Sequence, residues 1–148
     1  IEFLEMKLIH QTIYGLDRFA GISINTAMLR VQCERDLKGK LVNLSRGYIA
    51  AAGQKDALLA LVMGASSGFY PLLRAMLYLA GMDPPRERAG VLRALEAHHG
   101  VHLDGLKEIQ TLRSRKRPKP AQAELQRLFQ QVYGLTHALS LIVDEIKP

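Results

Sequence analysis

A run of small residues matches a catalytic pattern. Gly64-Ala65-Ser66-Ser67-Gly68 fits G-x-S-x-G, in which a sharp strand-to-helix turn exposes a nucleophilic serine above a parallel sheet. That chemistry requires residues 58–63 to form a strand, although the segments around them have helical spacing. The competing interpretation is a kink between helices, because small residues permit a bend and close approach.

A second candidate is the pair Arg93 and His98, which four residues separate. The spacing resembles that of the catalytic arginine and histidine of HEPN ribonucleases, which are helical bundles, and the resemblance implies metal-independent cleavage at an RNA phosphate. Ala94 stands where a polar residue usually follows that arginine. A histidine in the last turn of a helix would also simply complement the helix dipole.

The residues that could bind a metal do not form a convincing set. His98, His99 and His102 are close in sequence, but adjacent side chains on a helix diverge, so we expect no metal site here. Cys33 is the single cysteine and lies in an apolar helical pattern, which excludes a disulfide framework. A reducing compartment, the cytoplasm, is the simplest setting.

A basic run bounded by prolines follows in the second half of the chain. Its central residues Arg115, Lys116 and Arg117 could hold phosphate groups of a nucleotide or nucleic acid. No aromatic residue interleaves with them to stack bases, so nucleic-acid binding has little support. A solvated connector is the alternative interpretation.

Composition limits the class of protein. The 148 residues, 48% of them hydrophobic, fit one domain with a real core, and the net charge of +6 allows weak attraction to polyanions. Residues 57–73 carry no charge, but Gly64, Gly68 and Pro71 interrupt them. We therefore expect a buried, kinked core helix and not a membrane span.

Helical spacing dominates the elements that would position these residues. Apolar residues recur at three and four along two long segments, and Asn25 or Thr26 can cap the first. The prediction is an all-α antiparallel bundle of about five helices, residues 26–148, preceded by a short extended segment and loop, residues 1–25. The expected helices are 26–53, 55–80 with a break near 68–71, 85–98, 104–113 and 120–146.

The opening residues alternate partly, as in a strand. Ile1 and Phe3 fall on one face, and Glu2, Leu4 and Met6 on the other. A lone strand leaves its backbone groups unpaired. We therefore expect residues 1–8 to complete a sheet supplied by other polypeptide, either upstream or from a second copy.

The stretch IEFLEMKLIHQTIYG, followed by LRVQCERDLKGKLVNLSRGYIAAAG, resembles the rear portion of bacterial nucleotidyltransferase-like proteins of the polymerase-beta superfamily. In that family a small mixed sheet precedes a helical bundle, and the active site is a glycine-serine turn followed by Asp-x-Asp on a strand. This sequence contains no such acidic pair. The resemblance therefore implies a C-terminal helical domain without the metal-binding catalytic motif, which needs carboxylates to hold Mg²⁺ against a triphosphate.

The same resemblance implies roles for particular residues. Glu2 or Glu5 would approach the site as its third carboxylate, and Glu34, Arg35 and Lys38 would face the substrate groove. Mg²⁺ and a nucleoside triphosphate are implied for the full-length family, and the upstream domain is the implied partner. Two other classes stay open, namely a HEPN-like RNA-binding or ribonuclease module and a structural domain that forms a homodimer.

Overall fold

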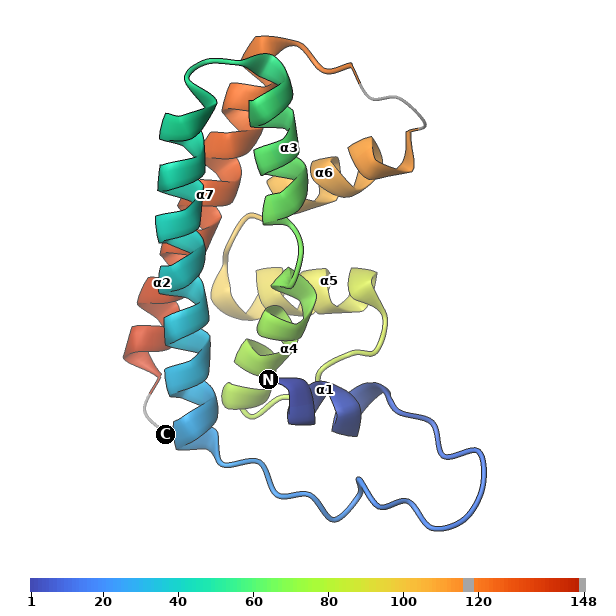
Figure 1. Cartoon of the computed structure of the whole chain (residues 1–148). Helices are drawn as coiled ribbons and strands as arrows, with labels where there is room; N and C mark the ends of the chain where they lie inside the picture. Colours follow the sequence, from blue (N-terminus) through green and yellow to red (C-terminus); the bar gives the residue numbers. More distant parts are fainter. Residues whose placement is uncertain (116–118, 147–148) are drawn as a thin grey trace.

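The computed structural model of the chain describes residues 1–115 and 119–146. This part contains seven α-helices and no strand, which confirms the predicted all-α class (Figure 1). The helices are α1 (Glu2–Ile9), α2 (Thr26–Ala51), α3 (Lys55–Ala65), α4 (Phe69–Leu79), α5 (Arg88–His99), α6 (Asp104–Ser114) and α7 (Gln122–Glu145).

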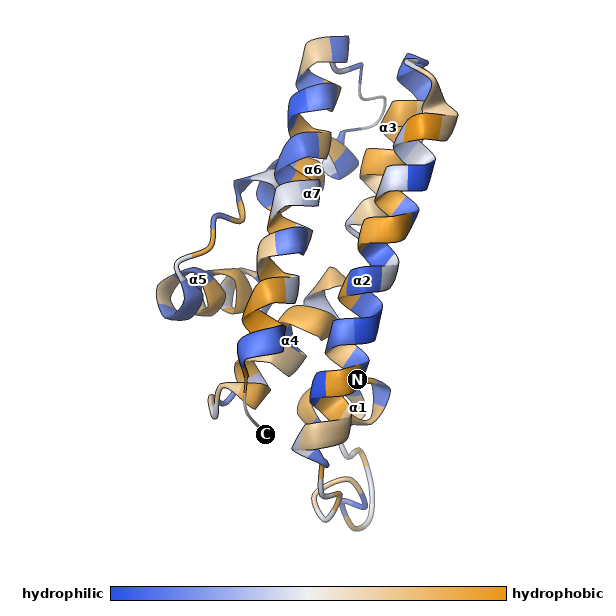
Figure 2. Cartoon of the chain, turned by 90° about the vertical axis from the view of Figure 1, so that its left-hand side faces the viewer, coloured by the Kyte–Doolittle hydropathy of each residue, from blue (hydrophilic) through white to orange (hydrophobic). Residues whose placement is uncertain are grey.

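Two long helices, α2 and α7, lie side by side along the molecule, and α3 packs against both of them (Figure 1). The chain then continues through α4, which contacts α1, α2 and α5, while α6 packs on α7 and α3. Coloured by hydropathy, α2 and α7 show alternating hydrophilic and hydrophobic bands along their lengths (Figure 2). This banding is the expected pattern of helices that bury one face in a bundle.

Helix α2 begins and ends as its sequence indicates. The side chain of Asn25 accepts a hydrogen bond from the Met28 amide at 2.9 Å, and the helix stops where Ala52 and Gly53 adopt positive φ angles of 46° and 76°. Cys33 lies fully buried in its apolar seam. Burial raises the pKa of the Cys33 thiol to about 12.

The predicted break in the long apolar segment is confirmed. Helix α3 ends at Ala65, and α4 starts after Gly68, whose φ of 73° is a left-handed conformation that favours glycine. The stretch Lys55–Leu79 is long and apolar enough to cross a membrane by length and composition alone. In the structure it forms two helices, and most of α4 is buried in the bundle.

The expected strand at residues 1–8 is wrong, because this segment forms helix α1. Ile1, Leu4 and Leu8 recur at three and four, and Leu4 is fully buried while the other two pack against the core. A helix satisfies its backbone groups internally, as in the bond from the Glu5 amide to the Ile1 carbonyl at 3.0 Å, and needs no neighbouring strand. Alternation over eight residues was too short a pattern to separate the two possibilities.

Residues 10–25 contain no helix or strand and connect α1 to α2. Their course is fixed by Asp17, whose carboxylate accepts hydrogen bonds from the amides of Phe19 and Ala20 and contacts the His10 ring at 2.8 Å. Lys7 on α1 donates to the Ile22 carbonyl at 2.6 Å. The linker is therefore held at its two ends, and its middle extends into solvent.

Candidate functional site

Glu2 and Glu5 are the two carboxylates expected near a metal, and Glu5 instead forms a contact within the bundle. Both oxygens of Glu5 accept hydrogen bonds from the Nη1 group of Arg74, at 2.9 and 3.2 Å. Glu2 lies exposed one turn earlier on α1. Within residues 1–115 and 119–146, no three histidine, cysteine, aspartate or glutamate side chains gather as metal ligands, so the residues there do not fit a Mg²⁺ site.

Arg74 is the buried charged side chain among the residues that the structure describes, with 6% of its surface exposed. Its Nε donates to the Pro85 carbonyl at 3.1 Å and its Nη2 to the Arg86 carbonyl at 2.6 Å. With Glu5 on Nη1, every nitrogen of the guanidinium has an acceptor. Arg74 therefore ties α1 and the α4–α5 connection to α4, as a buried cation requires.

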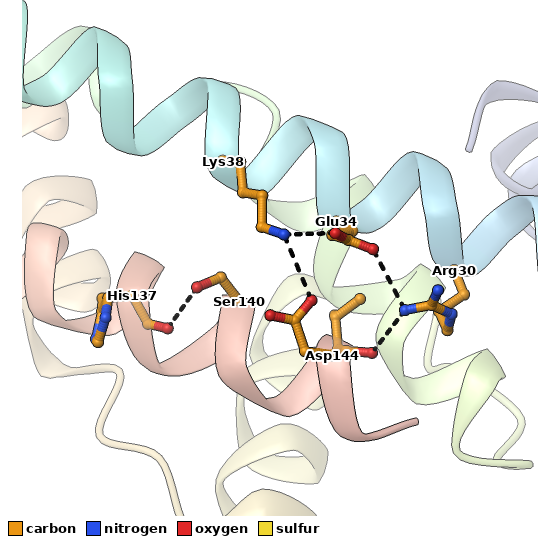
Figure 3. A network of polar contacts seen from close by, with 7 residues as sticks. Arg30, Glu34, Lys38, His137, Ser140 and Asp144 are labelled. Carbon is orange, nitrogen blue, oxygen red and sulfur yellow. Dashed lines mark hydrogen bonds and ion pairs between the residues drawn. The ribbon is translucent and has the colours of Figure 1, made fainter. Parts of the chain in front are cut away.

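The residues expected to face a substrate groove belong partly to a contact between α2 and α7 (Figure 3). Glu34 accepts hydrogen bonds from Lys38 and from Arg30, and Lys38 also lies 3.7 Å from Asp144 of α7. The hydrogen bond from Lys38 lowers the pKa of Glu34, and the same bond raises the pKa of Lys38. Arg35 is exposed on α2. Lys38 thus links α2 to α7, and Glu34 holds Lys38 within α2.

Arg93 and His98 are both exposed on α5. A separation of five positions places them about 140° apart around a helix, and no hydrogen bond joins them in the described part of the chain. His98 instead meets the His99 ring edge-on at 4.6 Å. The Nε2 atom of His99 is buried without a hydrogen-bond partner among the described residues. The pKa of His99 is lowered mainly by this burial and to a smaller extent by the charge of His98.

The basic run is described only in part. Arg115 follows α6 in an extended conformation and is exposed. Lys116 and Arg117 lie outside the described residues. The predicted phosphate contact of these three residues therefore stays a prediction.

A pocket of about 360 Å³ lies where α3 turns into α4. The turn contributes the two serine hydroxyls of the G-x-S-x-G run. A nucleophile turn requires residues 58–63 to form a strand, but these residues belong to helix α3. The nucleophile hypothesis is therefore wrong. Helices α4, α5 and α6 supply the other walls. We call this the junction pocket, and its lining residues are Ser66, Ser67, Gly68, Tyr70, Pro71, Arg88, Leu106, Gln110 and Arg113.

The polar groups of the junction pocket are organised by α6. Leu106, Gln110 and Arg113 recur at four and three, so they share one face of that helix. The Tyr70 hydroxyl donates to Gln110 Oε1 at 3.1 Å. Arg113 donates through Nη2 to the Met63 carbonyl and, at 3.3 Å, to the Ser67 hydroxyl. These bonds fix the walls of the pocket.

The junction pocket is electrostatically positive. Arg88 lies over the Tyr70 ring, 5.0 Å from its centroid, and no aspartate or glutamate is among the lining residues. Helix α4 starts at the pocket without a side-chain cap and without an acidic residue in its first turn. The uncapped amides add the positive end of a helix dipole to the two guanidinium groups.

A second candidate surface is apolar. Large apolar side chains of α1 and of the following linker are exposed, three of them almost completely, at 97%, 98% and 92% for Ile13, Tyr14 and Leu16. We call this surface the Ile1 end. It consists of Phe3, Met6 and Ile9 from α1 together with Ile13, Tyr14 and Leu16.

Sequence reasoning missed both the buried Arg74 and the junction pocket. A lone arginine inside the apolar stretch 57–79 was a usable signal for the first, because a charge in a core segment must find a partner. Arg113 belongs to the basic run, but Arg88 and Gln110 carry no local pattern. The pocket depends on tertiary contacts between three separate segments, namely residues 66–71, Arg88 and helix α6.

The chain was compared with models of protein families, with curated protein sequences and with solved structures. None of the three comparisons gives a match.

Proposed function

We propose that this chain is the helical, substrate-side domain of a nucleotidyltransferase-like protein and that a catalytic domain preceding Ile1 packs against the Ile1 end. The metal chemistry belongs to that preceding domain in this proposal, and the helical domain supplies a wall of the substrate cleft. The resemblance of residues 1–15 and 29–53 to the family supports the assignment. The proposed setting is the cytoplasm.

The observation that carries the proposal is the exposed apolar surface of the Ile1 end. Six large apolar side chains within the first sixteen residues are between 47% and 98% exposed. Contiguous apolar patches on a protein surface usually mark an interface with another protein surface, since exposing them to water is unfavourable. The side chains of Ile13, Tyr14 and Leu16 in the linker bury almost none of their surface against the bundle of this chain.

In this proposal the partner precedes Ile1 in the same polypeptide. The Ile1 nitrogen is partly buried and donates to Gln32 Oε1 at 2.7 Å, a bond that a peptide N–H can also make. Such polypeptide would join the chain at the start of α1 (Figure 1). Contact would be made by apolar side chains of α1 and of the linker that follows it, in place of the strand edge that the family resemblance implies.

The first test is the reading frame upstream of the codon for Ile1. The proposal requires a glycine-serine turn followed by two aspartates one residue apart. If the frame encodes that motif, the protein with its preceding domain should transfer a labelled nucleotide in the presence of Mg²⁺. A frame without the motif overturns the proposal.

The second test measures docking in solution, with the preceding domain produced separately and titrated with this chain. Ile13→Ser, Tyr14→Ser and Leu16→Ser together should weaken docking by at least about tenfold, because they remove the apolar anchors. The matched control is Ile49→Ser, since Ile49 is 77% exposed but lies on α2 far along the chain from the Ile1 end. Equal affinities of the triple variant and the wild type contradict the proposal.

Self-association is the competing outcome. If the chain alone is a dimer that the triple serine variant converts to a monomer, a second copy covers the Ile1 end and the proposed docking is wrong. Sizing by light scattering at several concentrations separates the two results.

A further inference from the structure

We propose that the junction pocket binds the phosphate group of a small molecule. This inference does not depend on the role proposed for the Ile1 end, because it uses only groups within this chain. The pocket volume of about 360 Å³ falls at the lower end of the usual range for ligand sites, roughly 300–1,000 Å³. It can hold a phosphate together with a modest organic group.

Two guanidinium groups supply the charge. Arg113 uses Nη2 for the Met63 carbonyl and the Ser67 hydroxyl, and within residues 1–115 and 119–146 no acceptor meets its Nε or Nη1. The Cζ atom of Arg88 lies over the Tyr70 ring, and within residues 1–115 and 119–146 no hydrogen bond uses the N–H groups of its side chain. Arginine binds phosphate oxygens through paired N–H groups, so two such edges on one pocket suit a dianion.

The backbone adds to the same preference. Gly68 turns the chain into α4 with a positive φ, and no side chain accepts from the first amides of that helix. Arg88 is the first residue of α5, where a cation opposes the positive end of the helix dipole. An anion bound near the first turns of α4 and α5 would offset the repulsion between the Arg88 cation and the positive end of the helix dipole. The nearest acid in sequence, Glu87, is not among the lining residues.

Neutral groups complete the recognition. The Ser67 hydroxyl and the Gln110 amide line the pocket, and each can donate to a phosphate oxygen. The Ser66 hydroxyl also lines the pocket but donates to the Met63 carbonyl at 3.2 Å. The Tyr70 ring forms an apolar wall beside Pro71 and Leu106. The arrangement of cations around a partly aromatic wall favours a phosphate ester over a simple carboxylate, which has fewer oxygens to satisfy the available donors.

The test is a titration of the ¹⁵N-labelled chain with inorganic phosphate and then with a phosphate monoester, at constant ionic strength. Saturable shifts of the Gly68, Phe69, Tyr70 and Gln110 amides are expected. Arg88→Gln with Arg113→Gln should weaken binding at least about tenfold, the equivalent of ~1.4 kcal/mol. The matched control is Arg18→Gln with Arg46→Gln, which removes two exposed charges outside the pocket and should leave the affinity unchanged.

Arg113 also supports the end of α3, so its loss can disturb the fold. Arg88→Gln alone keeps the test decisive, because Arg88 makes no hydrogen bond within residues 1–115 and 119–146. The proposal is overturned if phosphate produces no saturable shifts at the four amides, if both double variants lose affinity equally, or if acetate binds as tightly as phosphate.

Discussion

The arginines of this protein occupy two contrasting regions. Arg74 lies in the interior between α1 and α4, where a carboxylate and two carbonyls take up all its nitrogens. Arg88 and Arg113 line the junction pocket, where no lining residue is acidic. An arginine side chain thus has all its nitrogens hydrogen-bonded to the protein in the first region, and keeps N–H groups available for a ligand in the second.

The contrast follows from the cost of burying charge. A guanidinium removed from water loses its hydration and must replace it with hydrogen bonds to internal acceptors. A buried arginine is therefore stable only where its neighbours supply those acceptors. An arginine at a pocket keeps its water and can exchange it for a ligand. Substitutions should therefore change stability in the first region and ligand affinity in the second.

The largest effect is expected for Arg74→Met. Removing the cation leaves Glu5 and two carbonyls without their partner in a buried site, which should lower the free energy of unfolding by about 3–5 kcal/mol. Urea denaturation followed by circular dichroism measures the change. Arg93→Met, at an exposed position on α5, should stay within about 0.5 kcal/mol of the wild type. Equal losses at the two positions would contradict the contrast.

Glu5→Gln sharpens the same comparison from the other partner. The amide keeps the shape of the side chain but loses the negative charge and one of the two oxygens that accept from Arg74, so we expect a loss of about 1.5–3 kcal/mol. In a double-mutant cycle with Arg74→Met, the two losses should be far from additive. Additive losses would mean that Glu5 and Arg74 stabilise the fold separately.

The backbone at the junction pocket should respond less strongly. Gly68→Ala forces a Cβ into a φ of 73°, which should cost about 1–2 kcal/mol. The space itself is open, since the nearest atom to a Cβ there is Lys40 Nζ at 3.7 Å. Gly64→Ala is the control, because it lies within α3 and has nothing within 4 Å. It should stabilise the helix slightly, and a shared sign for the two variants would refute the assigned conformation of Gly68.

A buried group without a partner gives the smallest effect. Burial and the nearby charge of His98 lower the pKa of His99, so the unfolded chain binds more protons than the folded one just below the ordinary histidine pKa of about 6.5. Stability should therefore be fully present above that pH and fall as the pH drops through it. His99→Leu should reduce this slope in urea titrations between neutral and mildly acidic pH. The same substitution at exposed His102 should retain it.

The sequence predicted the long helices well, because three-and-four spacing over more than twenty residues has no other regular solution. Asn25 as the cap of α2 and the break before α4 were also readable from residue type. Residues 1–8 were misassigned, since a segment this short satisfies both strand alternation and helical spacing. The burial of Leu4 decided between them.

The candidate sites were much less predictable. Expected site residues such as Glu5 and Lys38 form contacts between helices, and nothing in their local sequence distinguished that role from ligand binding. The junction pocket joins residues from positions 66 to 113, and only the packing of α4, α5 and α6 brings them together. Helical periodicity determines which face is buried, but it does not determine which polar residues meet at the surface.

Because Cys33 is fully buried, its chemical reactivity reports on opening motions of the bundle. As the lone cysteine, fully enclosed on α2 and with a strongly suppressed thiolate, it can react with an alkylating reagent only during moments when the helix separates from its neighbours. The labelling rate of the unmodified chain therefore reports how often the interior opens, without any engineered probe.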